Sequence, residues 1–276
     1  PSELAQEIGQ YDGLVVRSAT TVTREVLLKG KEGALKIVGR AGAGLDNIDV
    51  AAAKELGIKV VNTPGLNANA VAELTVAMAI VLARKLGVAF SSIKAGRWEK
   101  KGLVGTELSG KVIGLVGLGY VGRLVAKKAV GLDMKVWAYD PFLTPEAVTQ
   151  AGAAAKSLEE IWAGADYISL HLPKTPETVN LVNEAVLAKT KKGAFILNCA
   201  RGGLVDEQAL YAALKSGHLG GAALDVFDKE PPGESPLLAL DNFVATPHVG
   251  ASSLEAQLNV AEEVARLLVE FLSPGA

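Results

Sequence analysis

The fold is decided by one stretch of the sequence, Val112-Ile113-Gly114-Leu115-Val116-Gly117-Leu118-Gly119-Tyr120-Val121-Gly122. Its first five residues form an apolar run typical of a buried strand, and a helical pattern continues from Tyr120 to about Val130. Gly117 permits a tight turn, Gly119 lets the backbone approach a pyrophosphate, and Gly122 allows helix and strand to pack closely. The stretch therefore predicts a dinucleotide-binding turn, in which free N–H groups at the helix start face the phosphates.

An acidic residue follows this turn at the spacing that such sites use. Asp140 lies 18 residues after Gly122, at the end of the next predicted strand, Lys135–Tyr139. A carboxylate there accepts hydrogen bonds from the adenosine ribose hydroxyls and repels a 2′-phosphate. Residues 141–143 supply no cation to hold such a phosphate. The pattern favours NAD over NADP. The alternative to dinucleotide binding as a whole is a glycine-rich turn with an aspartate at this spacing by chance.

Short aliphatic runs alternate with helical stretches for most of the chain. The runs are continuously apolar rather than alternating, as expected of strands covered on both faces. Repeated strand–helix–strand units imply a doubly wound parallel α/β sheet. The predicted strands are Leu14–Arg17, Ile37–Arg40, Lys59–Asn62, Val112–Val116, Lys135–Tyr139, Tyr167–Leu170, Phe195–Asn198, Ala222–Asp225 and Val244–Thr246.

Helix boundaries are marked by capping residues. Ser157 and Glu160 have the spacing of a capping box. Asp206 is expected to cap a helix that ends before Gly217, where glycine suits a left-handed stop. Ser252, followed by Glu255, is expected to open a last helix that reaches about residue 272.

Two domains are expected. Gly110 begins a strand–helix series that continues to about Ala251, whereas only three strands precede Asn67, fewer than a stable open sheet usually has. We predict a Rossmann-type NAD-binding domain over residues 67–251. A smaller substrate-binding α/β domain is predicted from residues 1–66 and 252–276, with its N-terminal part incomplete.

Composition excludes several classes of protein. The 276 residues are 49% hydrophobic and 21% charged, and 28 Lys and Arg against 30 Asp and Glu give a net charge of −2. We therefore expect no nucleic-acid or membrane partner. The apolar segment from Ala70 to Ala83 is short for a membrane span. The single cysteine, Cys199, allows neither an internal disulfide nor a cysteine zinc cluster, so we expect no metal site and a cytoplasmic location.

Three polar residues in the second half suit hydride-transfer chemistry. Arg201 follows a predicted strand, Glu230 precedes a proline pair, and His248 follows Pro247. Ligands of open parallel sheets bind at the carboxyl ends of the strands, where all three are expected. A histidine held by a carboxylate exchanges the substrate proton, and an arginine binds the substrate carboxylate as a fork.

Each of these residues also has a simpler interpretation. Arg201 could form an ion pair that fixes its loop. Glu230 could lie in a solvated turn, and His248 could be a core histidine whose hydrogen bonds are satisfied. His218 is interpreted as a surface residue. His171, at a strand end, is expected to line the cofactor pocket without proton transfer, and Cys199 is expected to be a packed thiol near the nicotinamide rather than a nucleophile.

These motifs together resemble the D-isomer-specific 2-hydroxyacid dehydrogenases over essentially the whole chain. The resemblance rests on the glycine turn with Asp140 and on the runs Asn198-Cys199-Ala200-Arg201-Gly202-Gly203, Ala223-Leu224-Asp225-Val226-Phe227 with Glu230-Pro231, and Thr246-Pro247-His248-Val249-Gly250-Ala251. It implies Arg201 as substrate-binding, Glu230 as the partner of the histidine and His248 as the acid–base. It further implies a flavodoxin-like smaller domain. The implied dinucleotide contacts, besides the glycines of the turn, are Tyr120, Val121, Asp140, Leu172, Cys199, Ala200, Asp225, Gly250 and Ala251.

Within the family, the motifs are most similar to those of members that oxidise 3-phospho-D-glycerate to 3-phosphohydroxypyruvate, the first step of serine biosynthesis. The runs Val16–Thr20, Val38–Asn47 and Gly105–Leu108 carry this similarity. It implies that Arg17, Arg40, Ala43 and Gly44 bind the phosphorylated 2-hydroxy acid; the simpler interpretation is that both arginines only pair with carboxylates. The resemblance also implies a homodimer or homotetramer that assembles near residues 70–86, with Lys100 and Lys101 reaching a neighbouring subunit's substrate.

Two departures and three alternatives accompany this interpretation. The family's small domain usually begins with a strand–helix–strand unit before the part found here, and many members carry regulatory domains after it. The alternatives are another 2-hydroxyacid dehydrogenase acting on glyoxylate, hydroxypyruvate or lactate, an NADH-sensing corepressor, and a cofactor-binding fragment without turnover.

Overall fold

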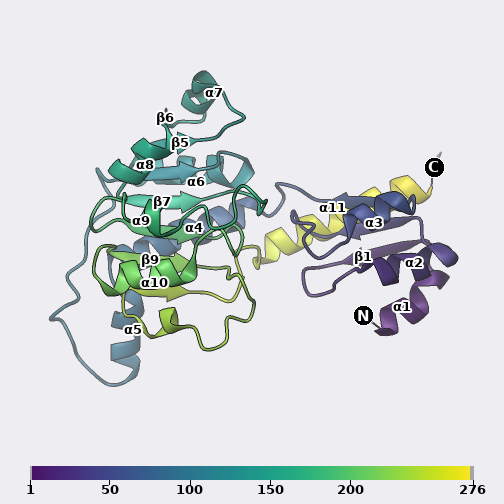
Figure 1. Cartoon of the computed structure of the whole chain (residues 1–276), viewed down its shortest axis with the longest axis horizontal. Coiled ribbons are helices and arrows are strands. Elements are labelled where there is room, and N and C mark those ends of the chain that lie inside the picture. Colours follow the sequence, from purple (N-terminus) through teal and green to yellow (C-terminus); the bar gives the residue numbers. More distant parts are fainter. Residues whose placement is uncertain (1, 274–276) are drawn as a thin grey trace. The chain divides into compact units, whose positions relative to one another are not determined.

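The computed structural model describes residues 2–273 and divides them into two compact units (Figure 1). Unit 1 contains the residues up to Asn69 together with those from Ala251 onward, and unit 2 is Ala70–Gly250. Each unit has its own parallel sheet and its own hydrophobic core.

Unit 2 is a seven-stranded sheet in which every neighbouring pair is parallel, with the order β10-β9-β8-β7-β4-β5-β6. Its strands are β4 (Val112–Val116), β5 (Lys135–Tyr139), β6 (Ala154–Ala155), β7 (Tyr167–Leu170), β8 (Phe195–Asn198), β9 (Gly221–Leu224) and β10 (Phe243–Ala245). From β4 the chain adds strands first on one side and then, from β7, on the other. The strand order therefore reverses between β4 and β7, which is where ligands bind in doubly wound sheets.

Helices cover both faces of this sheet, and each face has a separate core. The helices of unit 2 are α4 (Ala68–Ala83), α5 (Leu86–Lys94), α6 (Tyr120–Val130), α7 (Pro145–Gln150), α8 (Leu158–Gly164), α9 (Glu184–Leu187), α10 (Glu207–Lys215) and the 3₁₀ turn η2 (Pro236–Ala239). Met78 of α4 and Val125 of α6 belong to one core, whereas Trp162 of α8 and Leu210 of α10 belong to the other. The predicted Rossmann-type architecture is confirmed.

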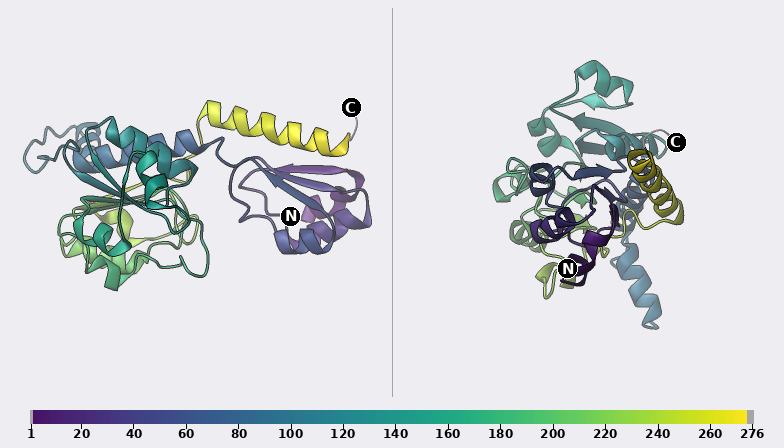
Figure 2. Two further views of the ribbon diagram at one scale, coloured as in Figure 1. Left: turned by 90° about the horizontal axis from the view of Figure 1, so that it is seen from above. Right: turned by 90° about the vertical axis from the view of Figure 1, so that its right-hand side faces the viewer.

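Unit 1 is a smaller parallel sheet with the order β1-β2-β3. The strands are β1 (Gly13–Val16), β2 (Ile37–Arg40) and β3 (Lys59–Asn62), and the helices are α1 (Ser2–Glu7), η1 (Ile8–Gln10), α2 (Arg24–Glu32), α3 (Val50–Glu55) and α11 (Leu254–Leu272). Figure 2 shows α11 along one face of the sheet and the N-terminal helices on the other. Leu268 of α11 packs where Gly13 and Gly39 leave room on the strands, so the last helix closes this small core.

Most predicted elements match the structure closely, and the differences are local. A strand of two residues, β6, was not predicted because it is too short to show periodicity. The strands β1, β9 and β10 each begin and end one residue earlier than predicted. Ser253, not Ser252, caps α11, since its side chain accepts the hydrogen bond from the Ala256 N–H. The Ser157–Glu160 capping box and the Asp206 cap are confirmed.

Within residues 2–273, no single helix is both long and apolar enough to cross a membrane. The pair α4 and α5 passes that test of length and composition only when taken together, and it is bent by 72°. In α4 itself, Ala72, Met78, Ala79 and Leu82 are buried in the core of unit 2.

Candidate active site

The glycine turn between β4 and α6 has the shape that a dinucleotide phosphate needs. Gly117 has a φ of 99°, and a Cβ on it would lie 2.5 Å from the His171 carbonyl oxygen. A Cβ on Gly122 would lie 2.3 Å from the Gly117 carbonyl oxygen. A Cβ on Gly119, by contrast, would meet nothing within 4 Å. Two glycines thus permit chain-on-chain packing, and the third leaves open space in front of the α6 N-terminus.

Asp140, which follows β5, faces this turn. Its Oδ2 accepts a hydrogen bond from the Leu118 N–H at 2.8 Å, and its Oδ1 accepts one from the Phe142 N–H at 3.0 Å. The carboxylate therefore lies beside the turn that would hold the pyrophosphate. Tyr120, the first residue of α6, is 67% exposed at the same turn, and Phe142 is 92% exposed. These residues fit NAD in both shape and charge.

The half-buried imidazole of His171 and the buried thiol of Cys199, both near the turn, are unsuited to donating a proton at neutral pH. Enclosure beneath the turn lowers the pKa of His171 to about 4, so its imidazole is neutral at pH 7, and its Nε2 lies 3.0 Å from the Ser169 hydroxyl. Burial raises the pKa of the Cys199 thiol to about 12. The Cys199 Sγ packs 3.5 Å from the Met78 Sδ. At neutral pH the Cys199 thiol is therefore not a thiolate nucleophile, and the His171 imidazole is not a charged proton donor.

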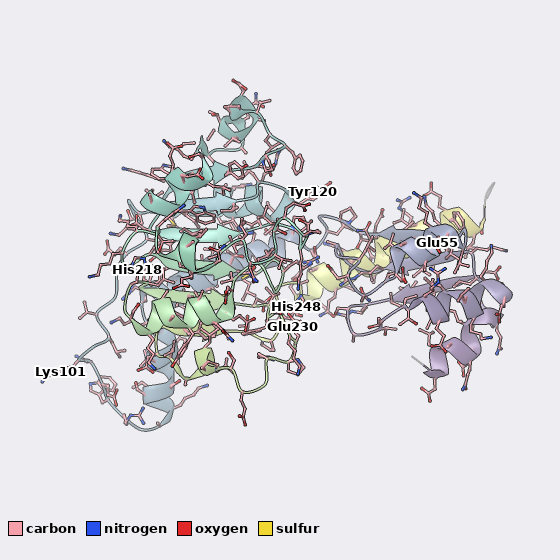
Figure 3. All side chains as sticks on the ribbon, in the orientation of Figure 1. Glu55, Lys101, Tyr120, His218, Glu230 and His248 are labelled. Atoms are coloured by element: carbon pink, nitrogen blue, oxygen red, sulfur yellow. The ribbon has the colours of Figure 1, made fainter. Side chains whose placement is uncertain are left out.

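Glu230 and His248 come together at the carboxyl edge of the sheet (Figure 3). His248 follows β10 and Glu230 follows β9, and the His248 Nδ1 lies 2.7 Å from the Glu230 Oε2. The other oxygen of Glu230 accepts a hydrogen bond from the Phe227 N–H at 3.1 Å. Both side chains remain accessible, with 48% and 38% of their surface exposed for His248 and Glu230. The pair is thus fixed by the Phe227 N–H on one side and partly exposed on the other.

His248 has a φ of 53°, a left-handed conformation that is costly for a residue with a Cβ. The fully buried Asp225 holds it there. The Asp225 carboxylate accepts hydrogen bonds from the Thr246 hydroxyl at 2.5 Å and from the N–H groups of Val249 and Gly250, both at 2.8 Å. The Asp225 carbonyl accepts a fourth bond, from the His248 N–H at 2.9 Å. Asp225 is therefore the anchor of the segment that presents the imidazole.

Arg201 projects from the turn after β8, and Asn198 shapes that turn. Asn198 is buried; its Oδ1 accepts from the Ala200 N–H at 3.0 Å, and its Nδ2 donates to the Arg201 carbonyl at 2.8 Å. The half-buried guanidinium donates from Nη1 to the Ala200 carbonyl at 2.7 Å. Asn198 stands in the run that carries the family resemblance, but no role was predicted for it, although asparagine side chains commonly hydrogen-bond the backbone that follows them.

The remaining predicted contacts lie around these elements. Val121 is half-buried on α6, the Leu172 side chain lies near Gly117, and a Cβ on Gly250 would lie 2.9 Å from the Asp225 Oδ2. Ala200 lies in the turn before Arg201, and Ala251 belongs to unit 1. His218, predicted at the surface, is half-buried, and its Nε2 lies 2.9 Å from the Leu187 carbonyl oxygen, so its role is structural.

In unit 1, the predicted substrate-binding residues follow two neighbouring strands. Arg40 pairs in register with Val16, so Arg17 stands one residue beyond it at the same edge of the sheet. The Arg40 Nη1 donates to the Ala41 carbonyl at 2.9 Å. Ala43 and Gly44 lie in the loop after β2, where the Ala43 carbonyl accepts from the Asn62 Nδ2 at 2.6 Å. Two arginines are thus brought to one edge of the small sheet.

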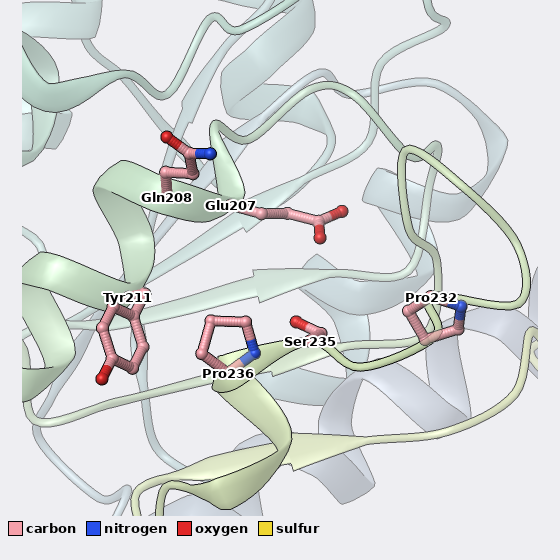
Figure 4. Close-up of a pocket in the computed structure, with 6 residues that line it drawn as sticks. All are labelled: Glu207, Gln208, Tyr211, Pro232, Ser235 and Pro236. Carbon is pink, nitrogen blue, oxygen red and sulfur yellow. The ribbon is translucent and has the colours of Figure 1, made fainter.

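A separate groove of about 480 Å³ lies beside the start of α10 (Figure 4). Its lining residues are Glu207, Gln208, Tyr211, Pro232, Ser235 and Pro236. None of the predicted site residues lines this groove.

Comparison with known proteins agrees with this geometry. Residues 76–250 match the family model described as D-isomer specific 2-hydroxyacid dehydrogenase, NAD binding domain. A D-3-phosphoglycerate dehydrogenase from Synechocystis sp. is 48% identical over 271 residues, which cover 98% of this chain and 49% of that protein. One from Homo sapiens is 46% identical over 270 residues, covering 98% of this chain and 50% of that protein. The chain spans about half the length of these curated relatives.

Solved structures give the same result. The apo-structure of D-lactate dehydrogenase from Escherichia coli is similar with a TM-score of 0.88 at 29% identity, covering 99% of this chain and 87% of that chain. An NAD-dependent formate dehydrogenase from Staphylococcus aureus in complex with NAD has a TM-score of 0.86 at 32% identity, covering 98% and 82%. The cofactor expected from Asp140, NAD, is the one that the matched domain binds. The chain belongs to the D-isomer specific 2-hydroxyacid dehydrogenase family.

Proposed function

We propose that the chain carries the NAD-dependent oxidation of 3-phospho-D-glycerate to 3-phosphohydroxypyruvate, the entry to serine biosynthesis. The observation that carries the proposal is the Glu230–His248 pair at 2.7 Å, on the sheet edge where the glycine turn opens. The curated relatives named D-3-phosphoglycerate dehydrogenase, at 46–48% identity, support the choice of substrate.

The imidazole of His248 accepts the substrate's hydroxyl proton. An ionised carboxylate only accepts hydrogen bonds, so the Nδ1 that faces Glu230 carries the proton and Nε2 is the base. Glu230 stabilises the imidazolium that forms. Bound NAD supplies the acceptor for the hydride that leaves C2 of the substrate.

The Arg201 guanidinium binds the substrate carboxylate. A planar guanidinium offers two parallel N–H donors to a carboxylate, which fixes the substrate's orientation as well as its charge. In the reductive direction the same donors polarise the carbonyl. The buried Asn198 hydrogen-bonds the Ala200 N–H and the Arg201 carbonyl, so it holds the backbone from which the guanidinium extends.

The phosphate is bound by Arg17 and Arg40 of unit 1, the small unit that binds substrate. A phosphorylated acid carries more negative charge than lactate or glyoxylate and needs more cationic donors. Two arginines at the ends of adjacent strands supply them. An unphosphorylated 2-hydroxy acid is the competing substrate class.

We propose a homodimer formed through α4, α5 and the loop that follows α5. Figure 2 shows α5 projecting from the body of unit 2. Phe90 and Ile93 of α5 are 58% and 55% exposed, and Trp98 is 80% exposed. Such a set of exposed large apolar side chains is typical of a subunit contact. Sedimentation analysis of the wild type against Trp98→Glu tests this: the variant sediments as a monomer, and an unchanged species would contradict it.

The decisive experiment is steady-state turnover on matched substrates. We expect NADH formation with 3-phospho-D-glycerate and NADH consumption with 3-phosphohydroxypyruvate, both faster than with D-lactate, hydroxypyruvate or glyoxylate. His248→Gln serves as the inactive control. Faster turnover of an unphosphorylated acid would assign the other substrate class, and NADH binding without any turnover would contradict the enzymatic proposal.

A further inference from the structure

Three loops of unit 2 meet at Gly203. Lys174 comes from the loop after β7 and Asp228 from the loop after β9, and the Lys174 Nζ lies 2.8 Å from the Asp228 Oδ1. Gly203, in the loop after β8, has a φ of 77°. A Cβ on Gly203 would lie 2.6 Å from the Lys174 Nζ and 2.8 Å from the Asp228 Oδ1. The ion pair therefore lies directly against the backbone of the third loop, where only glycine leaves room.

Backbone contacts join the same three loops. The Asn180 N–H donates to the Gly203 carbonyl at 2.8 Å. A Cβ on Gly202 would lie 1.8 Å from the Phe227 carbonyl oxygen, so these two loops touch backbone to backbone. The Asp228 N–H donates to the Glu207 Oε1 at 2.8 Å, which ties the loop after β9 to the first residue of α10.

This junction links the two parts of the candidate site, Arg201 and the Glu230–His248 pair, through only a few residues of chain. Arg201 immediately precedes Gly202, and Glu230 follows Asp228 by two residues. The Phe227 N–H, adjacent to Asp228, donates to the Glu230 Oε1 at 3.1 Å. A shift of the Asp228 loop against the Gly203 loop therefore moves Glu230, and with it His248, relative to Arg201.

We propose that Asp228, paired with Lys174 across Gly203, is a positioning residue that fixes the Glu230–His248 pair relative to Arg201. The inference rests on the proposed function, because the spacing matters only if these groups act on one substrate. The pair is 39% exposed at Lys174 and 66% at Asp228, and exposed ion pairs add little to global stability. Its effect is therefore on geometry, where a displacement of about 1 Å can cost up to about 100-fold in rate.

The test compares Asp228→Asn, Lys174→Met and the charge-swapped Lys174→Asp/Asp228→Lys. Asp228→Asn keeps the backbone N–H that Glu207 accepts. Lys191→Met is the matched control, since the Lys191 Nζ lies 2.7 Å from the Asp166 Oδ1, directly before β7 and thus at the opposite edge of the sheet.

We expect each single variant to lower kcat about tenfold, while the dissociation constant of NADH stays within about twofold. The swapped pair should recover most of the loss, and Lys191→Met should behave as the wild type. Unchanged kcat in Asp228→Asn would overturn the proposal. Parallel losses of kcat, NADH affinity and melting temperature would also overturn it, because they indicate a general structural role, and so would a swapped pair that recovers nothing.

A second readout separates this inference from the proposed function. Hydrogen exchange of the Phe227 and Asp228 amides, measured by mass spectrometry on the intact protein, needs no substrate. We expect faster exchange in Asp228→Asn and restoration in the swapped pair. If the wild type turned over none of the 2-keto acids, the proposed function would fail. Hydrogen exchange would still test whether the Lys174–Asp228 ion pair fixes the loop that carries Glu230. Unaltered amide protection in Asp228→Asn would overturn that role.

Discussion

The Nδ1 of His248 lies 2.7 Å from the Oε2 of Glu230, although 18 residues separate them in the chain. Two strand ends meet to make this contact, and a backbone N–H from Phe227 holds the carboxylate's other oxygen. One ring nitrogen is thereby committed to Glu230, and in the proposed mechanism the other takes the substrate proton. The proposed proton transfer therefore depends on how the chain is arranged at the carboxyl edge of the unit 2 sheet.

Glu230→Gln tests the charge in this pair. The amide keeps only one acceptor oxygen, so it cannot accept from both the Phe227 N–H and the His248 Nδ1 as the carboxylate does, and it no longer carries the charge that stabilises an imidazolium. We expect kcat to fall about 100-fold with unchanged NADH affinity. Steady-state turnover and NADH fluorescence titration measure the two quantities, and wild-type kcat would show that His248 needs no carboxylate.

Asp225→Asn should destabilise the protein, because the buried carboxylate accepts three hydrogen bonds from the segment that carries His248. An amide replaces one acceptor oxygen with a donor that faces an N–H group. We expect a loss of about 2 kcal/mol in the free energy of unfolding, measured by urea denaturation. Asp241→Asn, at an exposed position, is the matched control, and equal stability of both variants would contradict the anchoring role.

Comparison of Asp140 with Asp225 shows what the sequence alone could predict. The role of Asp140 follows from local spacing, since the glycine turn and the next strand end lie within one strand–helix–strand unit. The bonds of Asp225 depend on how residues 246–250 fold back, which no local pattern encodes. The Lys174–Asp228 pair spans 54 residues and exists only because three loops converge on Gly203. Strand and helix positions were predictable for the same reason as Asp140: periodicity and caps are local.

His171 should make stability depend on pH. Its pKa in the folded chain is about 4, below the usual value of 6.5, so the unfolded chain binds more protons between these two pH values. The stabilisation is fully present above pH 6.5 and is lost as the pH falls towards 4, by at most about 3 kcal/mol. His171→Asn should flatten this part of the curve of unfolding free energy against pH. A variant with the wild-type slope would show that another group is responsible.

The Cys199 thiol should resist modification in the folded protein. Burial raises its pKa to about 12, so almost no thiolate exists at pH 8, and Met78 packs against the sulfur. We expect Ellman's reagent to react slowly in buffer and rapidly in denaturant. The folded protein should also keep its activity during the incubation, and fast native labelling would contradict the packed position.

Arg17→Ala separates the two substrate classes. Arg17 stands at the end of β1, one residue beyond the position that pairs with Arg40, so together they present two guanidinium groups at one edge of the small sheet. Loss of one charged hydrogen-bonding partner of the phosphate should raise KM about tenfold for 3-phosphohydroxypyruvate. KM for hydroxypyruvate, which has no phosphate, should change little. Arg24→Ala is the control, because the Arg24 Nη2 pairs with Glu55 at 2.6 Å on the outside of the helices. Equal effects of Arg17→Ala on both substrates would mean that the arginine binds the carboxylate that they share.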